Sequence, residues 1–180
     1  FKDYICDVGQ YLADADAAGK KVLFEAQLGA LRDIDFGIYP YTTSSNTIGA
    51  YAPIGAGIAG HKLTNSIGVM KAYSSCVGDG PFVTELAMTE EEKHALREAG
   101  HEYGAATGRP RRVGPIDLVA SHYGVFCQGC DEVALTLLDV LDYMEKIPVV
   151  TGYKLTDGTI TKRFPMGMAL DTAQPVVELS

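Results

Sequence analysis

Short apolar runs alternate with amphipathic stretches along the chain, a pattern typical of alternating strands and helices. Residues 11–20 predict a short alanine-rich helix that ends at Gly19, and the apolar run 21–25 predicts a buried parallel strand. Further strands are predicted over 66–73 and over 132–139, the second ending in an acid. This alternation indicates an α/β fold with a mainly parallel sheet flanked by helices.

A capping box predicts a helix that begins after Thr89. The Thr89 hydroxyl can accept from the Glu92 amide, and the Glu92 carboxylate can reach back to the Thr89 amide. An apolar stripe continues to Tyr103, and Gly104 should end the helix.

A further helix is predicted over 117–126, and residues 147–164 predict a β-hairpin around the turn Asp157-Gly158. The helix should turn an apolar face inward, on which a histidine is expected to be a satisfied core residue. That face carries Leu118, Val119, His122, Tyr123 and Phe126.

Residues 37–62 are rich in glycine, serine, threonine and proline and have no period. A stretch of this length without regular structure predicts a functional loop that wraps a ligand. A turn is predicted at 78–81.

Three arginines crowd into the segment Thr107-Gly-Arg-Pro-Arg-Arg-Val-Gly114. Guanidinium groups repel one another, and each can bind a carboxylate or phosphate through two hydrogen bonds, so the cluster indicates an anion site. The glycines should let the backbone bend around the ligand. A solvated basic turn is the alternative.

The net charge of −8 disfavours a nucleic-acid binder, which needs broad positive surface, while a small anionic ligand fits. No apolar run is long enough to cross a membrane, and the first residues lack a signal peptide and an initiator Met. We therefore expect a cytoplasmic protein and a fragment of something longer. The pair Cys127 and Cys130 leaves zinc binding and thiol redox chemistry open, with reduced cysteines favoured.

Several segments occur together with the arginine segment in one order. They are Asp33-Ile-Asp-Phe-Gly-Ile-Tyr-Pro40, Thr43-Ser-Ser-Asn46, Val69-Met-Lys-Ala-Tyr73, Val77-Gly-Asp-Gly-Pro-Phe-Val-Thr-Glu-Leu86 and Leu138-Asp-Val-Leu-Asp142. Over residues 5–178 the chain resembles adenylosuccinate synthetase, in the central and C-terminal part of that enzyme. The resemblance implies a homodimer with a fold related to P-loop nucleotide hydrolases. It also implies a GTP- and Mg²⁺-dependent ligation of IMP and L-aspartate for AMP synthesis.

The resemblance also implies roles for individual residues. Thr43 and Arg109 would contact IMP, and Gln27 is a further candidate for IMP binding. Asp139 would accept hydrogen bonds from the two N–H donors on the edge of guanine. GTP would be bound by Arg111, Leu137, Leu138 and Asp139. Aspartate would be bound by a mobile loop made of Ala105, Ala106, Thr107, Gly108, Arg109, Pro110 and Arg111.

The chain departs from the family's pattern at four positions. At the position of the family's IMP-contacting glutamine this chain has Leu28, and its glutamine, Gln27, is one residue earlier. A shift of one residue on a strand turns the side chain to the other face, so either a bulge brings Gln27 to the ligand or the contact is lost. Leu137 replaces the lysine that stacks on guanine, Cys76 replaces the arginine before Val77, and Pro115 replaces a tryptophan.

No catalytic residue and no metal ligand of the family is identified in the chain. The chain does not match the family's glycine-rich phosphate loop, which carries a catalytic aspartate with a histidine nearby. It also does not match the family's C-terminal segment, which closes over guanine. Residues 1–180 are therefore expected to be a single partial domain that is inactive alone. A degenerate paralogue that only binds a nucleotide or anion, and a protein built on the thiols of Cys127 and Cys130, are the alternatives.

Overall fold

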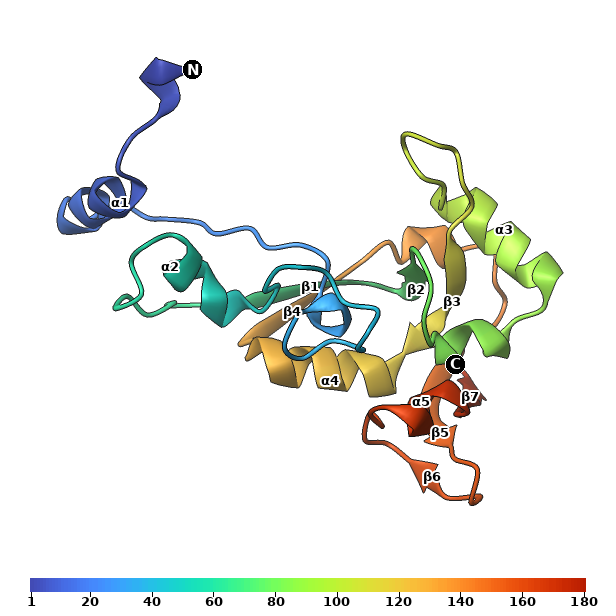
Figure 1. The fold of residues 1–180 in the computed structure, drawn as a ribbon. Helices are drawn as coiled ribbons and strands as arrows, with labels where there is room; N and C mark the ends of the chain where they lie inside the picture. Colours follow the sequence, from blue (N-terminus) through green and yellow to red (C-terminus); the bar gives the residue numbers. More distant parts are fainter.

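Two sheets organise the computed structural model of the chain, which describes residues 1–180 (Figure 1). The smaller sheet is a parallel pair, β1 (Ile67–Lys71) and β4 (Glu132–Thr136). The larger sheet has the strand order β2 (Tyr73–Cys76), β3 (Arg112–Asp117), β5 (Pro148–Lys154) and β6 (Ile160–Thr161), and β7 (Gln174–Leu179) also pairs with β5. Its β3–β5 pair is parallel and its other pairs are antiparallel.

Five α-helices accompany the sheets: α1 (Val8–Ala17), α2 (Ala52–Gly55), α3 (Glu90–Gly100), α4 (Leu118–Gln128) and α5 (Met168–Asp171). Short 3-10 turns lie at Lys2–Tyr4, Ala30–Arg32, Gly49–Tyr51, Val83–Ala87 and Asp139–Leu141. An extended segment links α1, at one end of the molecule, to the rest (Figure 1). The parallel pairs and flanking helices confirm the α/β class, and β5 and β6 form the predicted hairpin.

The buried side chains form two clusters. The first joins α3 to β2 and β3 and contains Ala72, Tyr73, Met88, Leu96, Val113 and Leu141. The second packs α4 on β5 and contains Val83, Val119, Val150, Tyr153, Leu170 and Ala173. Gly114 is required between β3 and the turn Val83–Ala87, because a Cβ there would lie 2.7 Å from the Thr84 carbonyl oxygen. Close packing therefore explains this glycine, which the sequence assigned to bending around a ligand.

The predicted helices form with shifted ends. Asp7 caps α1 by accepting from the Gln10 amide at 3.0 Å, so this helix begins before residue 11. Both hydrogen bonds of the Thr89 capping box are present in α3. The helix ends at Gly100 rather than Gly104, because His101 adopts a left-handed conformation with φ 51°.

The predicted inward face of α4 is wrong in part. Val119 is buried, but the side chain of Phe126 is 83% exposed and His122 is also exposed. His122 is therefore not a core histidine. Leu118 is 40% exposed, so the buried stripe is narrower than the run of apolar residues indicated.

The strand predicted at 21–25 is wrong, since this segment is extended, unpaired and largely exposed, with Leu23 93% exposed. A strand requires a neighbour that accepts its amides, and none lies beside this segment. The strand at 132–139 does form as β4, although its residues are mostly exposed rather than buried. The strand predicted over 66–73 forms as β1, and strands β2, β3 and β7 were not predicted, apart from Tyr73 at the start of β2.

Candidate functional site

A buried carboxylate lies beside the arginine segment. Glu102 follows α3 and is 1% exposed. Its Oε1 accepts from Lys71 Nζ at 2.5 Å and from the Tyr73 hydroxyl at 2.6 Å, and its Oε2 accepts from Arg111 Nη1 at 2.9 Å. Because Lys71 ends β1 and Tyr73 begins β2, this carboxylate joins both sheets to the base of the arginine segment.

The charges around Glu102 keep it ionised. Burial alone would raise the pKa of Glu102, but the hydrogen bonds from Lys71, Tyr73 and Arg111 outweigh burial and lower that pKa below its usual range. Burial and the bond to Glu102 raise the pKa of Tyr73. The side chains of Lys71 and Arg111 are each 33% exposed, so both remain accessible to a ligand.

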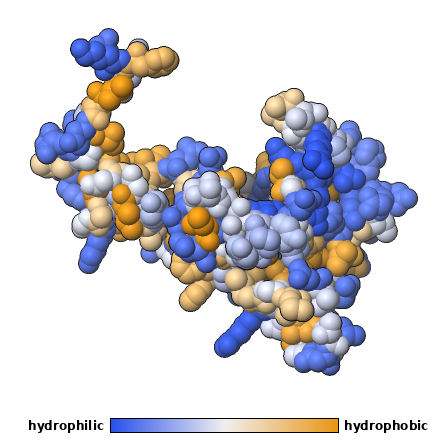
Figure 2. Space-filling view, in the orientation of Figure 1, coloured by the Kyte–Doolittle hydropathy of each residue, from blue (hydrophilic) through white to orange (hydrophobic).

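Residues 103–111 form a narrow loop that stands out from the body between α3 and β3 (Figure 1). Its base is closed by hydrogen bonds from the Gly104 amide to the Arg109 carbonyl at 2.9 Å and from the Arg111 amide to the Glu102 carbonyl at 2.9 Å. Gly108 at the tip has φ 64°, a conformation that favours glycine. Hydrophilic side chains gather over this end of the molecule (Figure 2).

The three arginines of this segment have different environments. Arg112 lies in β3 and forms an ion pair with Glu85 at 2.6 Å, and its guanidinium lies 5.3 Å from the Phe82 ring centre. Arg111 is paired with Glu102, and its Nε is buried without an acceptor. The side chain of Arg109 makes no hydrogen bond or ion pair within the protein. The expectation of three guanidiniums directed at one anion is therefore wrong for Arg112.

The residues expected to bind GTP follow β4 at the same edge. Lys71 and Thr136 are register partners, so the ends of β1 and β4 are level, and the turn Asp139–Leu141 begins three residues later. Leu137 has φ 59°, and Asp139 is exposed and close enough to Tyr73 for its negative charge to contribute to the raised pKa of that tyrosine. The GTP candidates thus follow the carboxyl end of a parallel pair, where α/β sheets bind ligands, and Glu102 joins Lys71 at that end to Arg111 of the aspartate candidates.

Asp33 organises the loop that carries Thr43. Asp33 is fully buried, and its carboxylate accepts from the backbone amides of Asp35, Phe36, Thr47 and Ile48 at 2.5–3.3 Å. Burial tends to raise the pKa of Asp33, but these amide bonds prevail and lower it. Four backbone donors on one carboxylate explain how a segment with little regular structure keeps a defined shape.

Two arginines hold the turn after β2. Arg32 donates to the carbonyls of Val77 at 3.0 Å and Asp79 at 3.2 Å, while Arg112 donates to the carbonyls of Gly78 at 3.4 Å and Gly80 at 2.8 Å. Along residues 77–80, the carbonyls therefore accept in turn from Arg32 and from Arg112. Since Arg32 belongs to the Thr43 segment and Arg112 to β3, the turn links the two candidate ligand segments.

Gln27 and Leu28 line one hollow of about 440 Å³, together with Asn46, Thr47 and Tyr51. On a strand, Gln27 and Leu28 would point to opposite faces. Residues 21–27 do not form a strand, so this alternation does not keep the two side chains apart. Leu28 has φ 74°, which marks a local bend at the expected glutamine position. No hydrogen bond or ion pair joins Thr43 to Arg109, the two main IMP candidates.

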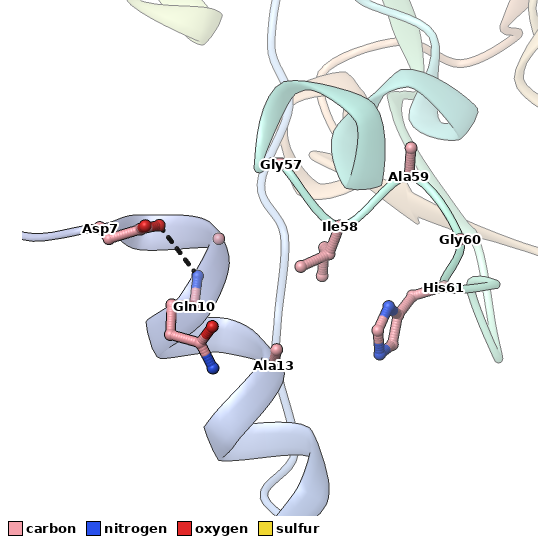
Figure 3. A pocket seen from close by; sticks show the side chains of 9 residues that line it. Asp7, Gln10, Ala13, Gly57, Ile58, Ala59, Gly60 and His61 are labelled. Carbon is pink, nitrogen blue, oxygen red and sulfur yellow. Dashed lines mark hydrogen bonds between the residues drawn. The ribbon is translucent and has the colours of Figure 1, made fainter.

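A second hollow, of about 500 Å³, lies between α1 and residues 57–61, where Asp7, Gln10 and Ala13 face Ile58 and His61 (Figure 3). This hollow lies at the opposite end of the molecule from α3 (Figure 1). None of the predicted site residues lines it.

The four cysteines are free thiols, and no cluster of three or more His, Cys, Asp or Glu side chains could hold a metal ion. No helix is long and apolar enough to cross a membrane. Three polar residues of the site were missed from the sequence, namely Arg32, Lys71 and Glu102. No spacing signal marks Glu102, because its burial depends on residues far away in the sequence.

The fold and the site together define an α/β protein with an arginine loop beside the carboxyl ends of a parallel pair of strands. The profile of the adenylosuccinate synthetase family matches residues 1–179. The chain therefore belongs to the adenylosuccinate synthetase family.

Similar proteins agree with this assignment. The chain is 47% identical to the adenylosuccinate synthetase of Symbiobacterium thermophilum over 180 residues and 46% identical to that of Listeria innocua over 179 residues. These alignments cover 98% and 99% of the chain but only 41% of each relative. These alignments support membership of the family. They do not support the prediction that the chain corresponds to the central and C-terminal part of the enzyme.

A solved structure of fully ligated adenylosuccinate synthetase from Plasmodium falciparum superimposes with a TM-score of 0.91 at 38% identity, covering 98% of this chain and 42% of that one. The fold class is thereby confirmed, and a relation to P-loop hydrolases is consistent with it. A cyanophage S-2L succinoaminodeoxyadenylate synthetase, bound to dGMP and to dATP as an energy donor, has a TM-score of 0.50 at 19% identity, with 91% of this chain and 49% of that one covered. This second likeness concerns the fold alone.

Proposed function

We propose that the full-length product of the gene encoding this chain joins IMP and L-aspartate at the expense of GTP, forming adenylosuccinate for AMP synthesis in the cytoplasm, as a homodimer. The γ-phosphoryl group of GTP passes to O6 of IMP and GDP leaves. The aspartate amine then bonds to C6, and phosphate leaves with the O6 oxygen. The observation that supports this most is the loop at 103–111, placed beside the carboxyl ends of β1 and β4 in a member of this family.

In this proposal the loop Ala105–Arg111 closes on aspartate. Arg109 is free of internal partners, so its guanidinium is available to the aspartate carboxylates and to IMP. Arg111 lies at the base, where its buried Nε lacks an acceptor. A buried N–H without an acceptor is costly, and a carboxylate bound beside Arg111 would remove that cost.

Asp139 recognises guanine in this proposal. An exposed carboxylate three residues beyond β4 can accept from the N1–H and 2-amino groups of guanine, whereas adenine lacks that donor pair. Leu137 and Leu138, 39% and 54% exposed, would contact the base through apolar surface in place of a stacked lysine.

Thr43 and Gln27 are the IMP candidates on the other side of the site. The Thr43 amide donates to the Arg32 carbonyl at 2.7 Å, and the Thr43 hydroxyl makes no hydrogen bond within the protein, so it is free for a phosphate oxygen. Gln27 is exposed and lines the 440 Å³ hollow, which we assign to IMP, so it can serve where Leu28 has replaced the family's glutamine.

The residues of this chain do not form a dedicated protein site for the Mg²⁺ ion that the family implies. No group of three or more carboxylate, thiol or imidazole side chains is close enough to hold a metal ion.

The test is to incubate the full-length gene product with IMP, GTP, Mg²⁺ and L-aspartate and to measure adenylosuccinate and phosphate by chromatography. We expect equal amounts of both products, and Arg109→Ala should lower turnover. Arg163→Ala is the matched control, because Arg163 is exposed and its side chain makes no hydrogen bond or ion pair. Absence of product in the presence of all substrates would rule out the proposal.

The isolated 180-residue chain should form no adenylosuccinate, since no general acid or metal carboxylate is identified in it. Positioned acid–base groups alone contribute about 10²- to 10⁴-fold to a rate. Measurable turnover by the purified chain would contradict this expectation.

A non-catalytic protein that binds only a nucleotide or anion is the second candidate. The substitutions at Leu28, Cys76 and Leu137 favour it, because each removes a polar group of the family's pattern. Calorimetric binding of IMP and GTP by the full-length product without any phosphate release would select this candidate.

A further inference from the structure

The side chain of Gln128, the last residue of α4, binds the backbone of the segment that follows Asn46. Its Oε1 accepts from the Gly49 amide at 2.7 Å, and its Nε2 donates to the Thr47 carbonyl at 3.1 Å. A residue of a parallel strand would bind a carbonyl and an amide with this same spacing. Because Gln128 is half-buried and lies 79 and 81 residues from these partners, its amide group clamps two distant parts of the chain together.

Thr47, at the centre of the clamped segment, is buried and held from three directions. Its amide donates to the Asp33 carboxylate at 2.5 Å, its hydroxyl donates to the Gly29 carbonyl at 2.8 Å, and its carbonyl accepts from Gln128. Asp33 and Gln128 together accept from the three successive amides of residues 47–49. The position of this segment therefore depends on two polar side chains, one of them from α4.

The clamped segment is a wall of the 440 Å³ hollow. Residues 45–48 line the hollow together with residues 24–28, and the bond from Thr47 to the Gly29 carbonyl connects these two walls. Gln128 does not line the hollow itself. Its effect on a ligand in the hollow must therefore pass through the backbone that it holds.

We propose that Gln128 is a positioning residue for the nucleotide of this hollow, because its amide group fixes Thr47 and Gly49 and so keeps the wall in its binding shape. This inference rests on the proposed function, which assigns the hollow to IMP. Without the clamp, a ligand must order the wall when it binds, and that ordering weakens its affinity. The GTP candidates follow β4 and lie outside the hollow, so GTP should be affected much less.

Gln128→Ala and Gln128→Glu remove the clamp in different ways. Alanine removes both hydrogen bonds, whereas an ionised glutamate keeps the shape but has only acceptors, so it faces the Thr47 carbonyl without a donor. A protonated glutamate regains a donor and restores both bonds. Half-burial and the facing carbonyl disfavour the ionised form, and so do the charges of Asp33, bound to the same segment, and of Asp131. The pKa of the introduced carboxyl should therefore lie above the usual value of about 4.3.

The experiment titrates the full-length gene product with IMP, and separately with GTP, in a calorimeter between about pH 8 and about pH 5, a range that covers the raised pKa of the introduced carboxyl. We expect Gln128→Ala to raise the Kd for IMP roughly 5- to 25-fold over the wild type at every pH, the effect of one or two lost neutral hydrogen bonds. Gln128→Glu should bind IMP as weakly at the upper end of the range and approach the wild type at the lower end. The Kd for GTP should change less than about 2-fold in both variants.

Gln174→Glu is the matched control for the added charge, because Gln174 is exposed and its side chain makes no hydrogen bond. This variant should bind IMP as the wild type does. Melting temperatures over the same pH range give a second readout of the clamp. The deficit of Gln128→Glu against the wild type should shrink as the pH falls, and the deficit of Gln128→Ala should stay constant.

Failure of this inference is distinct from failure of the proposed function. If the wild type binds IMP, an unchanged Kd for IMP in Gln128→Ala would refute the positioning role, and so would equal losses for IMP and GTP. A glutamate variant whose IMP affinity does not recover in acid would refute the role of the two hydrogen bonds. If the wild type binds no IMP, the proposed function and the positioning role fall together, while the melting temperatures still decide whether Gln128 clamps the segment.

Discussion

Glu102 offers the most direct test of the electrostatics of the site, through the substitution Glu102→Gln. Glutamine keeps the shape of the side chain and removes the charge that faces Lys71 and Arg111. Removing one partner of a buried ion pair costs about 3–5 kcal/mol. Because Lys71 and Arg111 are each 33% exposed, water stabilises them in part, and we expect the lower end, about 3 kcal/mol.

The pH dependence has a defined sign. The folded state lowers the pKa of Glu102, so its ion pairs stabilise the protein above the unfolded-state pKa of about 4.3. This stabilisation is lost as the pH falls through the lower, folded-state pKa. The difference in stability between the wild type and Glu102→Gln should therefore be constant near neutral pH and decrease below about pH 4.3.

Scanning calorimetry at several pH values measures both effects. A loss of about 3 kcal/mol lowers the melting temperature of a chain of this size by roughly 6–12 °C. Glu145→Gln is the control, because Glu145 is exposed and makes no hydrogen bond or ion pair. A loss below about 1 kcal/mol, or one that does not decrease in acid, would refute the view that Glu102 is an ionised centre of the network.

Three further predictions concern single residues. Arg111→Ala should raise the KM for aspartate roughly 10- to 100-fold, from the loss of a charge-assisted bond, and steady-state kinetics with an unchanged value would show that Arg111 does not bind aspartate. Asp139→Asn should reduce the preference for GTP over ATP at least ~10-fold in a competition assay, because the amide offers one acceptor oxygen where the carboxylate offers two. Asp33→Asn should cost about 1.5–3 kcal/mol of stability near neutral pH, and less as the pH falls through the lowered pKa of Asp33; a melting curve equal to that of the wild type at pH 7 would contradict this.

Local signals predicted the elements whose hydrogen bonds are local. The Thr89 capping box and the Asp157-Gly158 turn involve residues within a few positions of each other, and both form as expected. The strand predicted at 21–25 failed because a strand depends on a distant partner that an apolar run does not specify. Strand β3 was not predicted because Gly114 and Pro115 interrupt its hydrophobic pattern. In the structure, pairing with β2 and β5 holds this segment as a strand.

The site shows the same division. A cluster of arginines is visible in the sequence, and it indicated an anion loop. Which guanidinium is free depends on acidic partners elsewhere: Glu85 for Arg112 and Glu102 for Arg111. The sequence placed three arginines in one candidate anion site, and tertiary ion pairs distinguish Arg109 from the other two.

The register of β1 against β4 sets an order for folding during synthesis. Ile67 pairs with Glu132, so the intervening chain must leave the ribosome before the first bond of this pair can form. Bringing such distant segments together carries an entropic cost that a local helix or hairpin avoids. Helix α3, complete by Gly100 and capped by its own residues, can form earlier. The edge at the ends of β1 and β4 is consequently assembled later in the nascent chain than α3, although earlier than the pairing of β5 with β7.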